Sequence, residues 1–309
     1  MIIILLLVNI PQLFVDSILT GSVLALGAIG LTLVYRVMKF PNFVHAEFLT
    51  FGAYAAYAAN QYLGLGLLAG SISSFIASGL LAVISYRFVF SKLENVSSSG
   101  TTTKLTSMLI ASIGLGFIFR HSIQEIWGAN VLYFNIKVPV IYEYFTARFT
   151  SFDLIIISSS IFLVLFLHVF LTYTNLGKSI RATSDNPNLS LISGIDTDRV
   201  IYTVWFLSGG TAGFAGFLRG IDTRLSPWLG WNILLIAFAV VILGGIGSFY
   251  GAIIAAYLIG FVENIGVVAL INLELPTSYR PAIAFSILII MLIFRPQGLF
   301  STSSTRKGG

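Results

Sequence analysis

The sequence predicts an all-α protein, a polytopic transmembrane helical bundle with about eight or nine spans. Two observations lead to this prediction. Of the 309 residues, 57% are hydrophobic and only 9% are charged, with a mean hydropathy of +0.94, whereas soluble domains carry about 25% charged residues. The apolar residues also form long unbroken runs rather than ten-residue alternations, so the spans are expected to be helices and not barrel strands.

Nine apolar runs are candidates for these spans. A helix needs about 20 apolar residues to cross a bilayer. Seven runs are close to that length: residues 13–35, 66–86, 105–121, 151–173, 200–218, 248–270 and 280–294. Two shorter runs, 43–61 and 232–246, are either full spans or re-entrant half-helices. Residues 1–309 are therefore interpreted as a single membrane domain.

Three polar stretches lie between the runs. Residues 91–104 are rich in Ser and Thr and are predicted to be a loop. Residues 121–150 hold the Trp and Tyr side chains that are typical of a membrane interface. Residues 174–199 form the longest polar stretch without apolar periodicity. We place this last stretch in the cytoplasm.

The distribution of basic residues favours one orientation, because Lys and Arg are enriched in cytoplasmic loops. With nine spans, eleven of the seventeen basic residues lie inside; with 43–61 re-entrant, only nine do. The nine-span arrangement with its N-terminus outside is therefore preferred. Residues 1–8 are apolar but lack a basic segment and a small-residue cleavage site, so no signal peptide is expected there.

Glycines recur at spacings that favour close helix packing. In lipid, small residues allow the close backbone approach on which helix association depends. The candidate packing or hinge residues, with ordinary bundle packing as the alternative, are Gly209, Gly213, Gly244, Gly245, Gly247 and Gly251. The last four are flexible enough to break a helix inside the membrane, which is tolerated where the break is buried or lines a cavity.

Several polar side chains fall at membrane depth. Asn42, His45 and Glu47 stand just before an Ala-rich run, and Pro41 suits the first turn of a helix that starts near Asn42. On such a helix, Asn42 and His45 could share hydrogen bonds. Glu263 and Asn264 interrupt a second apolar run. An ionisable group in a span costs about 2.5–3.5 kcal/mol. These five residues are candidates for a substrate pathway, unless they merely pair with each other.

The motifs of several enzyme classes are missing from the sequence. There is no cysteine, no HExxH and no GxSxG, so we expect no catalytic residue, no metal site and no cofactor. Gly177-Lys178-Ser179 imitates the end of a phosphate-binding loop, but Thr172 stands where that loop requires glycine. The chain is therefore not expected to hydrolyse nucleotide or, given its charge pattern, to bind nucleic acid.

Four motifs are distributed along nearly the whole chain. The first runs from Gly30 to Tyr54 and includes Asn42, His45 and Glu47. The others are Gly177-Lys178-Ser-Ile-Arg181-Ala-Thr-Ser-Asp185 with Gly194 and Arg199, Gly244-Gly245-Ile-Gly247-Ser-Phe-Tyr-Gly251, and Arg295-Pro296-Gln297-Gly298-Leu299-Phe300. In this order they resemble the motifs of the branched-chain amino acid ABC transporter permeases of the LivH/LivM type.

The resemblance implies a set of partners. A permease of this kind sits in the plasma membrane beside a second homologous permease subunit. Two ATPase subunits lie beneath the pair and hydrolyse the ATP, and an extracytoplasmic solute-binding protein delivers the cargo. Residues 174–199 would then be the loop that couples the permease to the ATPases, with Gly177, Lys178, Arg181, Asp185 and Gly194 as its key positions. Arg181 and Asp185 are spaced to form an i, i+4 ion pair.

Three alternatives to the import of branched-chain or other hydrophobic amino acids remain open. The same machine could carry urea, short amides or aromatic acids, because the binding protein does most of the selection. The chain could instead be an ion-coupled secondary transporter, in which His45, Glu47 and Glu263 relay protons. A membrane enzyme or scaffold is disfavoured by the missing motifs.

Overall fold

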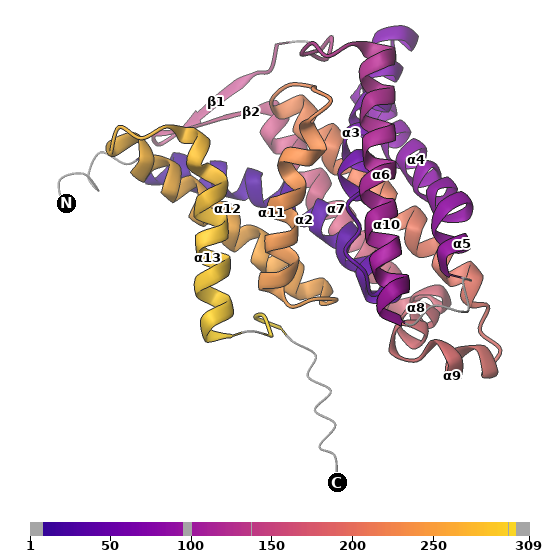
Figure 1. Ribbon diagram of the computed structural model, residues 1–309. Coiled ribbons are helices and arrows are strands. Elements are labelled where there is room, and N and C mark those ends of the chain that lie inside the picture. Colours follow the sequence, from indigo (N-terminus) through magenta and orange to yellow (C-terminus); the bar gives the residue numbers. More distant parts are fainter. Residues whose placement is uncertain (1–8, 95–100, 137, 296, 301–309) are drawn as a thin grey trace.

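The computed structural model of the protein describes residues 9–94, 101–136, 138–295 and 297–300. The prediction made for residues 1–8 falls outside this part of the chain, as do two of the eleven basic residues counted above as inside, Arg306 and Lys307. Figure 1 shows a bundle of helices with one short β-hairpin. The all-α prediction is therefore confirmed.

Most of the helices correspond to predicted spans. In chain order they are α2 (Ile10–Met38), α3 (His45–Leu63), α4 (Leu67–Ser85), α6 (Thr101–Trp127), α7 (Ser151–Tyr173), α10 (Thr197–Asp222), α11 (Leu229–Gly244), α12 (Phe249–Asn272) and α13 (Arg280–Phe294). Within the described residues, seven helices are long and apolar enough to cross a membrane. The two others are α3, with 19 residues, and α11, with 16. They account for the predicted total of eight or nine.

Shorter elements occupy the predicted loops. The structure adds a π-helix η1 (Tyr86–Phe90), α5 (Ser91–Glu94), β1 (Ile141–Tyr144), β2 (Ala147–Thr150), α8 (Asn175–Asp185), α9 (Pro187–Ile192) and a 3-10 turn η2 (Thr277–Tyr279). The loop expected over 91–104 is thus helical at both ends, and its middle lies outside the described residues. The stretch 121–150 was also predicted wrongly in part, because α6 continues to Trp127 and β1 pairs with β2.

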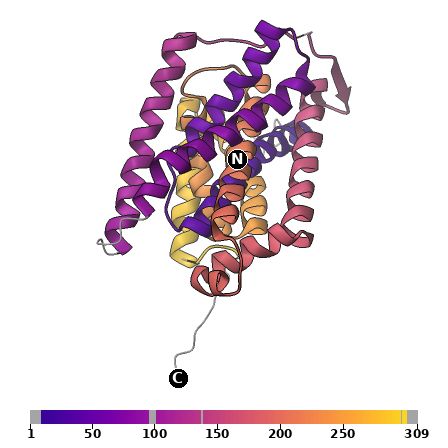
Figure 2. The same cartoon turned by 90° about the vertical axis from the view of Figure 1, so that its right-hand side faces the viewer.

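The core of the bundle is formed by α2, α3 and α10. Of the most apolar stretch of each helix, 89% is buried in α2 and 78% in α10, against 17% in α6 and 11% in α13. α2 packs against α10 and α12, and α3 against α4 and α10. Figure 2 shows α6, in magenta, at one edge of the bundle, where it leans mainly on α3. The central helices are therefore enclosed by protein, and the outer ones present apolar faces.

Glycines lie where the central helices meet. A Cβ atom on Gly213 of α10 would lie 2.6 Å from the Ser74 carbonyl oxygen of α4, and one on Gly209 would lie 2.6 Å from that of Ser78. These distances are far below van der Waals contact, so neither position has room for a larger residue. Both glycines therefore lie at a close contact between α10 and α4, and the packing or hinge role given to them stays a prediction.

The second glycine group ends a helix rather than breaking one inside a span. α11 ends at Gly244, and α12 begins at Phe249 after a turn in which Gly245 and Gly247 have φ angles of 97° and 83°. Such positive angles suit glycine. Gly251 of α12 lies directly against Gly244, so the four glycines form a tight connection between two helices.

Contacts between helix ends divide the molecule into two faces. On one face, the Asn135 amide N–H donates to the Asn60 side chain at 3.0 Å, and Leu132 forms a β-bridge with Leu225. On the opposite face, Arg36 Nε donates to Ser184 Oγ of α8 at 3.1 Å. Figure 1 likewise places the hairpin and α8–α9 at opposite ends. Because the sequence predicts that α8–α9 lies inside the cell, we call the face with α8–α9 the cytoplasmic face and the face with the hairpin the outer face.

The chain re-enters the bundle before α3. α2 ends at Met38 on the cytoplasmic face, and residues 39–44 then turn back among the helices. The Phe43 amide N–H donates to Ser112 Oγ at 3.1 Å, near the middle of α6. α3 therefore starts inside the bundle and continues to the outer face, where Asn60 lies. An irregular segment at such depth is tolerated because protein encloses it.

Candidate functional site

The first candidate cluster lies at the start of α3, where Asn42, His45 and Glu47 are all fully buried. α3 begins at His45 rather than near Asn42, because residues 43–46 form a turn in which the Ala46 amide bonds to the Phe43 carbonyl. The hydrogen bond predicted between Asn42 and His45 is not formed. The Asn42 side chain has no partner among the described residues.

His45 joins three helices. Its Nε2 lies 2.9 Å from the Gly27 carbonyl oxygen of α2, and its Nδ1 lies 3.5 Å from Ser208 Oγ of α10. A carbonyl can only accept, so Nε2 carries the proton and Nδ1 does not. The single hydroxyl proton of Ser208 is donated to the Gly30 carbonyl at 2.7 Å, so its oxygen is only a close neighbour of Nδ1. The imidazole thus fastens the start of α3 to the middle of α2.

Glu47 forms a buried ion pair with Arg120 of α6. Arg120 Nε donates to Glu47 Oε1 at 3.0 Å, and the Nη2 atom also contacts this oxygen. The guanidinium carbon lies 4.5 Å and 4.7 Å from the ring centres of Trp228 and Trp231, a cation–π arrangement. Arg120 was not among the predicted site residues. It lies in the predicted span 105–121, where a charged residue is rare and is itself a signal of a functional site.

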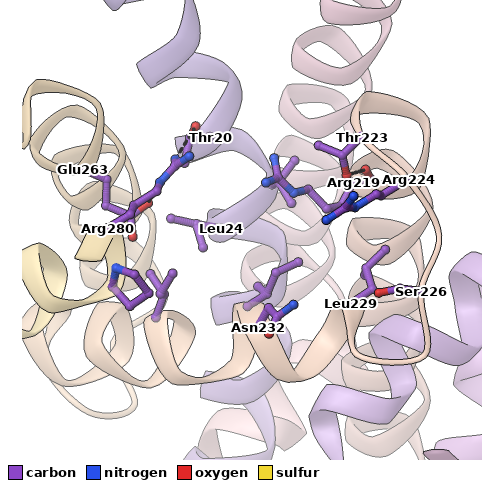
Figure 3. Close-up of a pocket in the computed structure, with 14 residues that line it drawn as sticks. Thr20, Leu24, Arg219, Thr223, Arg224, Ser226, Leu229, Asn232, Glu263 and Arg280 are labelled. Carbon is purple, nitrogen blue, oxygen red and sulfur yellow. Dashed lines mark hydrogen bonds and ion pairs between the residues drawn. The ribbon is translucent and has the colours of Figure 1, made fainter. Parts of the chain in front are cut away.

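The second cluster surrounds a cavity of about 380 Å³ near the outer face (Figure 3). It lies between α2, α10, α11, α12, α13 and the loop that connects α10 to α11. The residues that line it are Thr20, Val23, Leu24, Arg219, Thr223, Arg224, Ser226, Leu229, Asn232, Ile233, Ile236, Glu263, Arg280 and Pro281. Its walls combine charged groups with the apolar faces of α2 and α11.

Thr20 connects the polar residues of this cavity. Arg280 Nε donates to Glu263 Oε2 at 3.1 Å, and Arg280 Nη2 lies 3.3 Å from Thr20 Oγ1. Asn264 Nδ2 donates to Thr20 Oγ1 at 3.3 Å and to the Gly260 carbonyl at 2.8 Å. Glu263 therefore faces the cavity, whereas Asn264 is not among the residues that line it and supports Thr20.

The two clusters meet at α11 but do not merge. Trp228 and Trp231 cover Arg120 on one side of the helix, and Asn232 and Ile233 line the cavity. No hydrogen bond among the described residues joins Glu47 to Glu263. A direct proton relay between them has no bonded path in this arrangement.

The third candidate region is the α8–α9 unit on the cytoplasmic face. Arg181 donates to the Leu171 carbonyl at the end of α7, and its Nη2 lies 3.5 Å from the Thr172 carbonyl oxygen. The predicted Arg181–Asp185 ion pair is absent from the described residues, because the guanidinium caps α7 instead. Gly177 is buried against α7, where a Cβ atom would lie 2.5 Å from the Phe170 carbonyl oxygen.

α9 presents an apolar surface to solvent. Leu189, Leu191 and Ile192 are 59%, 57% and 85% exposed. Gly194 has a φ angle of 80° in the turn between α9 and α10, and Lys178 and Asp185 of α8 are exposed. An exposed apolar surface on a rigidly attached element is typical of a protein-binding site.

Comparisons with known proteins all point to one family. The profile of the family described as "Branched-chain amino acid transport system / permease component" matches residues 13–292. The chain is 27% identical to the high-affinity branched-chain amino acid transport system permease protein LivH of Salmonella typhimurium, over 96% of this chain and 97% of the relative. It is 28% identical to the probable branched-chain amino acid transport permease LivH of Methanocaldococcus jannaschii, over 92% and 90%.

More distant likenesses agree with the fold. An autoinducer 2 import system permease, LsrD of Salmonella paratyphi B, is 24% identical over 75% of this chain and 66% of its own length. Among solved structures, PsaBC from Streptococcus pneumoniae in complex with Fab matches with a TM-score of 0.50 and 14% identity, over 93% of this chain and 91% of that one. The chain is thus a multi-pass membrane protein, and it belongs to the permease component family of branched-chain amino acid transport systems.

Proposed function

We propose that this chain is the membrane permease subunit of an ATP-binding-cassette importer for branched-chain or other hydrophobic amino acids. The observation that carries the proposal is the family match over residues 13–292, which includes both the outer cavity and α8–α9. ATP is hydrolysed by separate ATPase subunits, and this chain binds no cofactor. A second permease subunit, two ATPases and an extracytoplasmic binding protein complete the machine.

The α8–α9 unit is suited to receive force from the ATPases. Its exposed apolar residues provide a contact surface, while Arg181 and Gly177 fix it to the end of α7. Arg36 of α2 bonds to Ser184 of α8. Because α2 also supplies Thr20 and Leu24 to the outer cavity, a push on α8 has a mechanical path through one helix to the opposite face.

Uptake of labelled leucine into vesicles tests the proposal. The vesicles hold this chain with its neighbouring transport subunits, and internal ATP is present or absent. We expect ATP-dependent uptake that excess isoleucine and valine suppress. If urea, an amide or another solute is taken up under ATP in place of leucine, the chain is still the permease of an ATP-driven importer, but its cargo is different. The similarity to LsrD, which is named for the import of autoinducer 2, is the reason to test other solutes. Uptake that follows a proton gradient without ATP would contradict the proposal.

A variant of α9 tests coupling. Replacing Leu191 and Ile192 with Ser removes apolar contact area on the cytoplasmic face, so we expect leucine uptake to fall at least tenfold with normal insertion. Leu273→Ser is the matched control, because Leu273 is 67% exposed at the end of α12, away from α9. Equal uptake in both variants would exclude α9 as the ATPase contact.

A further inference from the structure

We propose that a second cavity, on the cytoplasmic face, binds the phosphate of an anionic phospholipid of the inner leaflet. This cavity has a volume of about 360 Å³ and lies between α2, α7, α8 and the start of α12. In the proposed arrangement the Arg36 guanidinium binds the phosphate, and the acyl chains lie against α7 and α12. The inference goes beyond the proposed function, because it makes no assumption about the cargo.

The charge of this cytoplasmic cavity is positive. Arg36 of α2 and Arg181 of α8 line it, and no acidic residue is among its described lining residues. Neither arginine forms an ion pair within the described part of the chain, where the ion pairs involve other cations. An anion that enters the cavity therefore meets two cations that no carboxylate of the described residues neutralises.

Arg36 has hydrogen-bond donors left for a ligand. Its Nε atom donates to Ser184 Oγ at 3.1 Å, while its two Nη atoms form no hydrogen bond within the described residues. Neither Nη atom is a buried, unpaired polar atom. In Arg181, by contrast, both Nη atoms are directed at carbonyls at the end of α7. Since a guanidinium binds phosphate best through two parallel N–H bonds, Arg36 is the residue that holds the phosphate, and Arg181 adds charge.

Apolar side chains form much of the remaining wall of the cavity. Leu33 of α2, Leu171 of α7 and Phe249 of α12 all line it. Contact with such a wall removes the apolar surface of an acyl chain from water, which is favourable, whereas inorganic phosphate gains nothing from it. The combination of a cation with an apolar wall therefore favours a phospholipid over a free anion.

The apolar wall continues along the two helices toward the middle of the membrane. His168 of α7 and Tyr250 of α12 line the cavity, and the Tyr250 hydroxyl lies 2.8 Å from His168 Nδ1. Residues three or four positions apart lie on one face of a helix. At that spacing Leu165 of α7 and Ile254 of α12 are exposed, as is Leu258 one turn farther along. These faces give an acyl chain a continuous apolar surface.

The position of the cavity is appropriate for a lipid headgroup. It lies where α2 and α7 end, at Met38 and Tyr173, and where α12 begins, at Phe249. Tyrosines such as Tyr173 and Tyr250 are typical of a membrane boundary. Figure 2 shows α7 at the edge of the bundle opposite α6, passing directly into α8. Basic pockets between transmembrane helices on the cytoplasmic side are typical sites for anionic headgroups.

A photoactivatable lipid tests the inference directly. Phosphatidylglycerol with a diazirine in one acyl chain is incorporated into vesicles that hold the assembled transporter, and the labelled peptides are identified by mass spectrometry. We expect labels on α7 near Leu165 and on α12 near Ile254. The matching phosphatidylcholine probe, whose headgroup has no net charge, should label these peptides about fivefold less. Equal labelling by both probes, or labels confined to other helices, would overturn the inference.

A set of variants separates the charge of Arg36 from its structural contact. Arg36→Gln should reduce labelling by phosphatidylglycerol about fivefold. Ser184→Ala removes the hydrogen bond between α2 and α8 but keeps the cation, so its labelling should equal that of the wild type. Arg87→Gln is the matched control, because Arg87 is an exposed arginine of η1 and does not line the cavity. It should also label like the wild type.

Two results would contradict the role of Arg36. Undiminished labelling in a folded Arg36→Gln variant would show that the cation does not hold the lipid. An equal loss in Ser184→Ala would show that the placement of α8, and not the charge, controls labelling. If Arg36→Gln fails to fold, the comparison of the two lipid probes in the wild type still decides the inference.

Other occupants of the cavity give different results. Excess unlabelled phosphatidylglycerol should suppress labelling, whereas excess inorganic phosphate should not; suppression by inorganic phosphate would identify a site for a free anion. Benzoylphenylalanine in place of Tyr250 should crosslink to lipid in the assembled transporter. A crosslink to a second protein chain would show that this chain fills the cavity, and the inference would be wrong. Leucine uptake is not a readout of these experiments, so a different cargo leaves their results unchanged.

Discussion

Two glutamates on different helices form ion pairs with arginines, and the surroundings of the arginines differ. Glu47 of α3 and Glu263 of α12 expose 0% and 1% of their side chains. Arg120 exposes 3% and its guanidinium contacts the rings of two tryptophans, whereas Arg280 exposes 30% and borders the outer cavity. The first pair is enclosed by protein, and the second is accessible from the cavity.

The position of each arginine in its helix explains this difference. Arg120 lies about two turns before the end of α6, so its side chain must remain among neighbouring helices. Arg280 is the first residue of α13, where a side chain can extend past the helix end. An enclosed pair contributes to holding helices together, while an accessible pair can also exchange contacts with a ligand.

Loss of one partner from the enclosed pair has the largest expected effect. Arg120→Ala leaves the Glu47 carboxylate buried without its counter-charge, a change that costs about 3–5 kcal/mol. We expect a low yield of folded protein and a much lower Tm, measured by thermal unfolding of the protein in detergent. Arg87→Ala, at an exposed arginine of η1, is the control and should unfold like the wild type.

The double variant Glu47→Met/Arg120→Met separates charge burial from helix packing. It removes both charges, and replacing a buried ion pair by apolar residues is often neutral. Most of the lost stability should therefore return. If Arg120→Ala already unfolds at the wild-type temperature, the pair does not hold α6 to α3.

Loss of the arginine from the accessible pair, Glu263–Arg280, should affect transport more than stability. Arg280→Gln is expected to lower stability less than Arg120→Ala does, because glutamine keeps a hydrogen-bond donor beside Glu263 and the arginine side of this pair is partly exposed. Leucine uptake should fall several-fold, since Glu263 loses the contact that orients it in the cavity. Thermal unfolding and vesicle uptake of the same preparation give both numbers. A loss of stability as large as that of Arg120→Ala would show that the two pairs serve the fold alike.

The sequence was sufficient for the helices but not for the entry into α3. Unbroken apolar runs define the spans because lipid requires closed backbone hydrogen bonding. Residues 39–44 gave no such signal, since their return into the bundle depends on Ser112 of α6 and on the carbonyl of Gly27. Those contacts join residues that are distant along the chain, and no local pattern encodes them.

The candidate sites show the same limit. Asn42, His45 and Glu47 could be identified because polar residues are rare at membrane depth. Their partners could not be deduced, since spacing along α3 suggested that Asn42 pairs with His45. Arg181 was likewise matched to Asp185 by helical spacing, yet it caps α7. Helical spacing predicts which side chains on one helix could form a hydrogen bond or an ion pair. It does not reveal partners on other helices, which these side chains bind instead.

The smallest expected effect concerns the cation whose charge is already compensated. Arg219 and Asp222 form an i, i+3 pair at the rim of the cavity, with side chains 30% and 19% exposed. Arg219→Gln should change stability by about 0.5 kcal/mol or less, because solvent screens a partly exposed ion pair. Asp222→Asn removes the same pair from the other side and should have an effect of the same size. Thermal unfolding of both variants in detergent measures these effects. A loss of stability in either variant as large as that of Arg280→Gln would show that the exposure of an ion pair does not decide how much it contributes to stability.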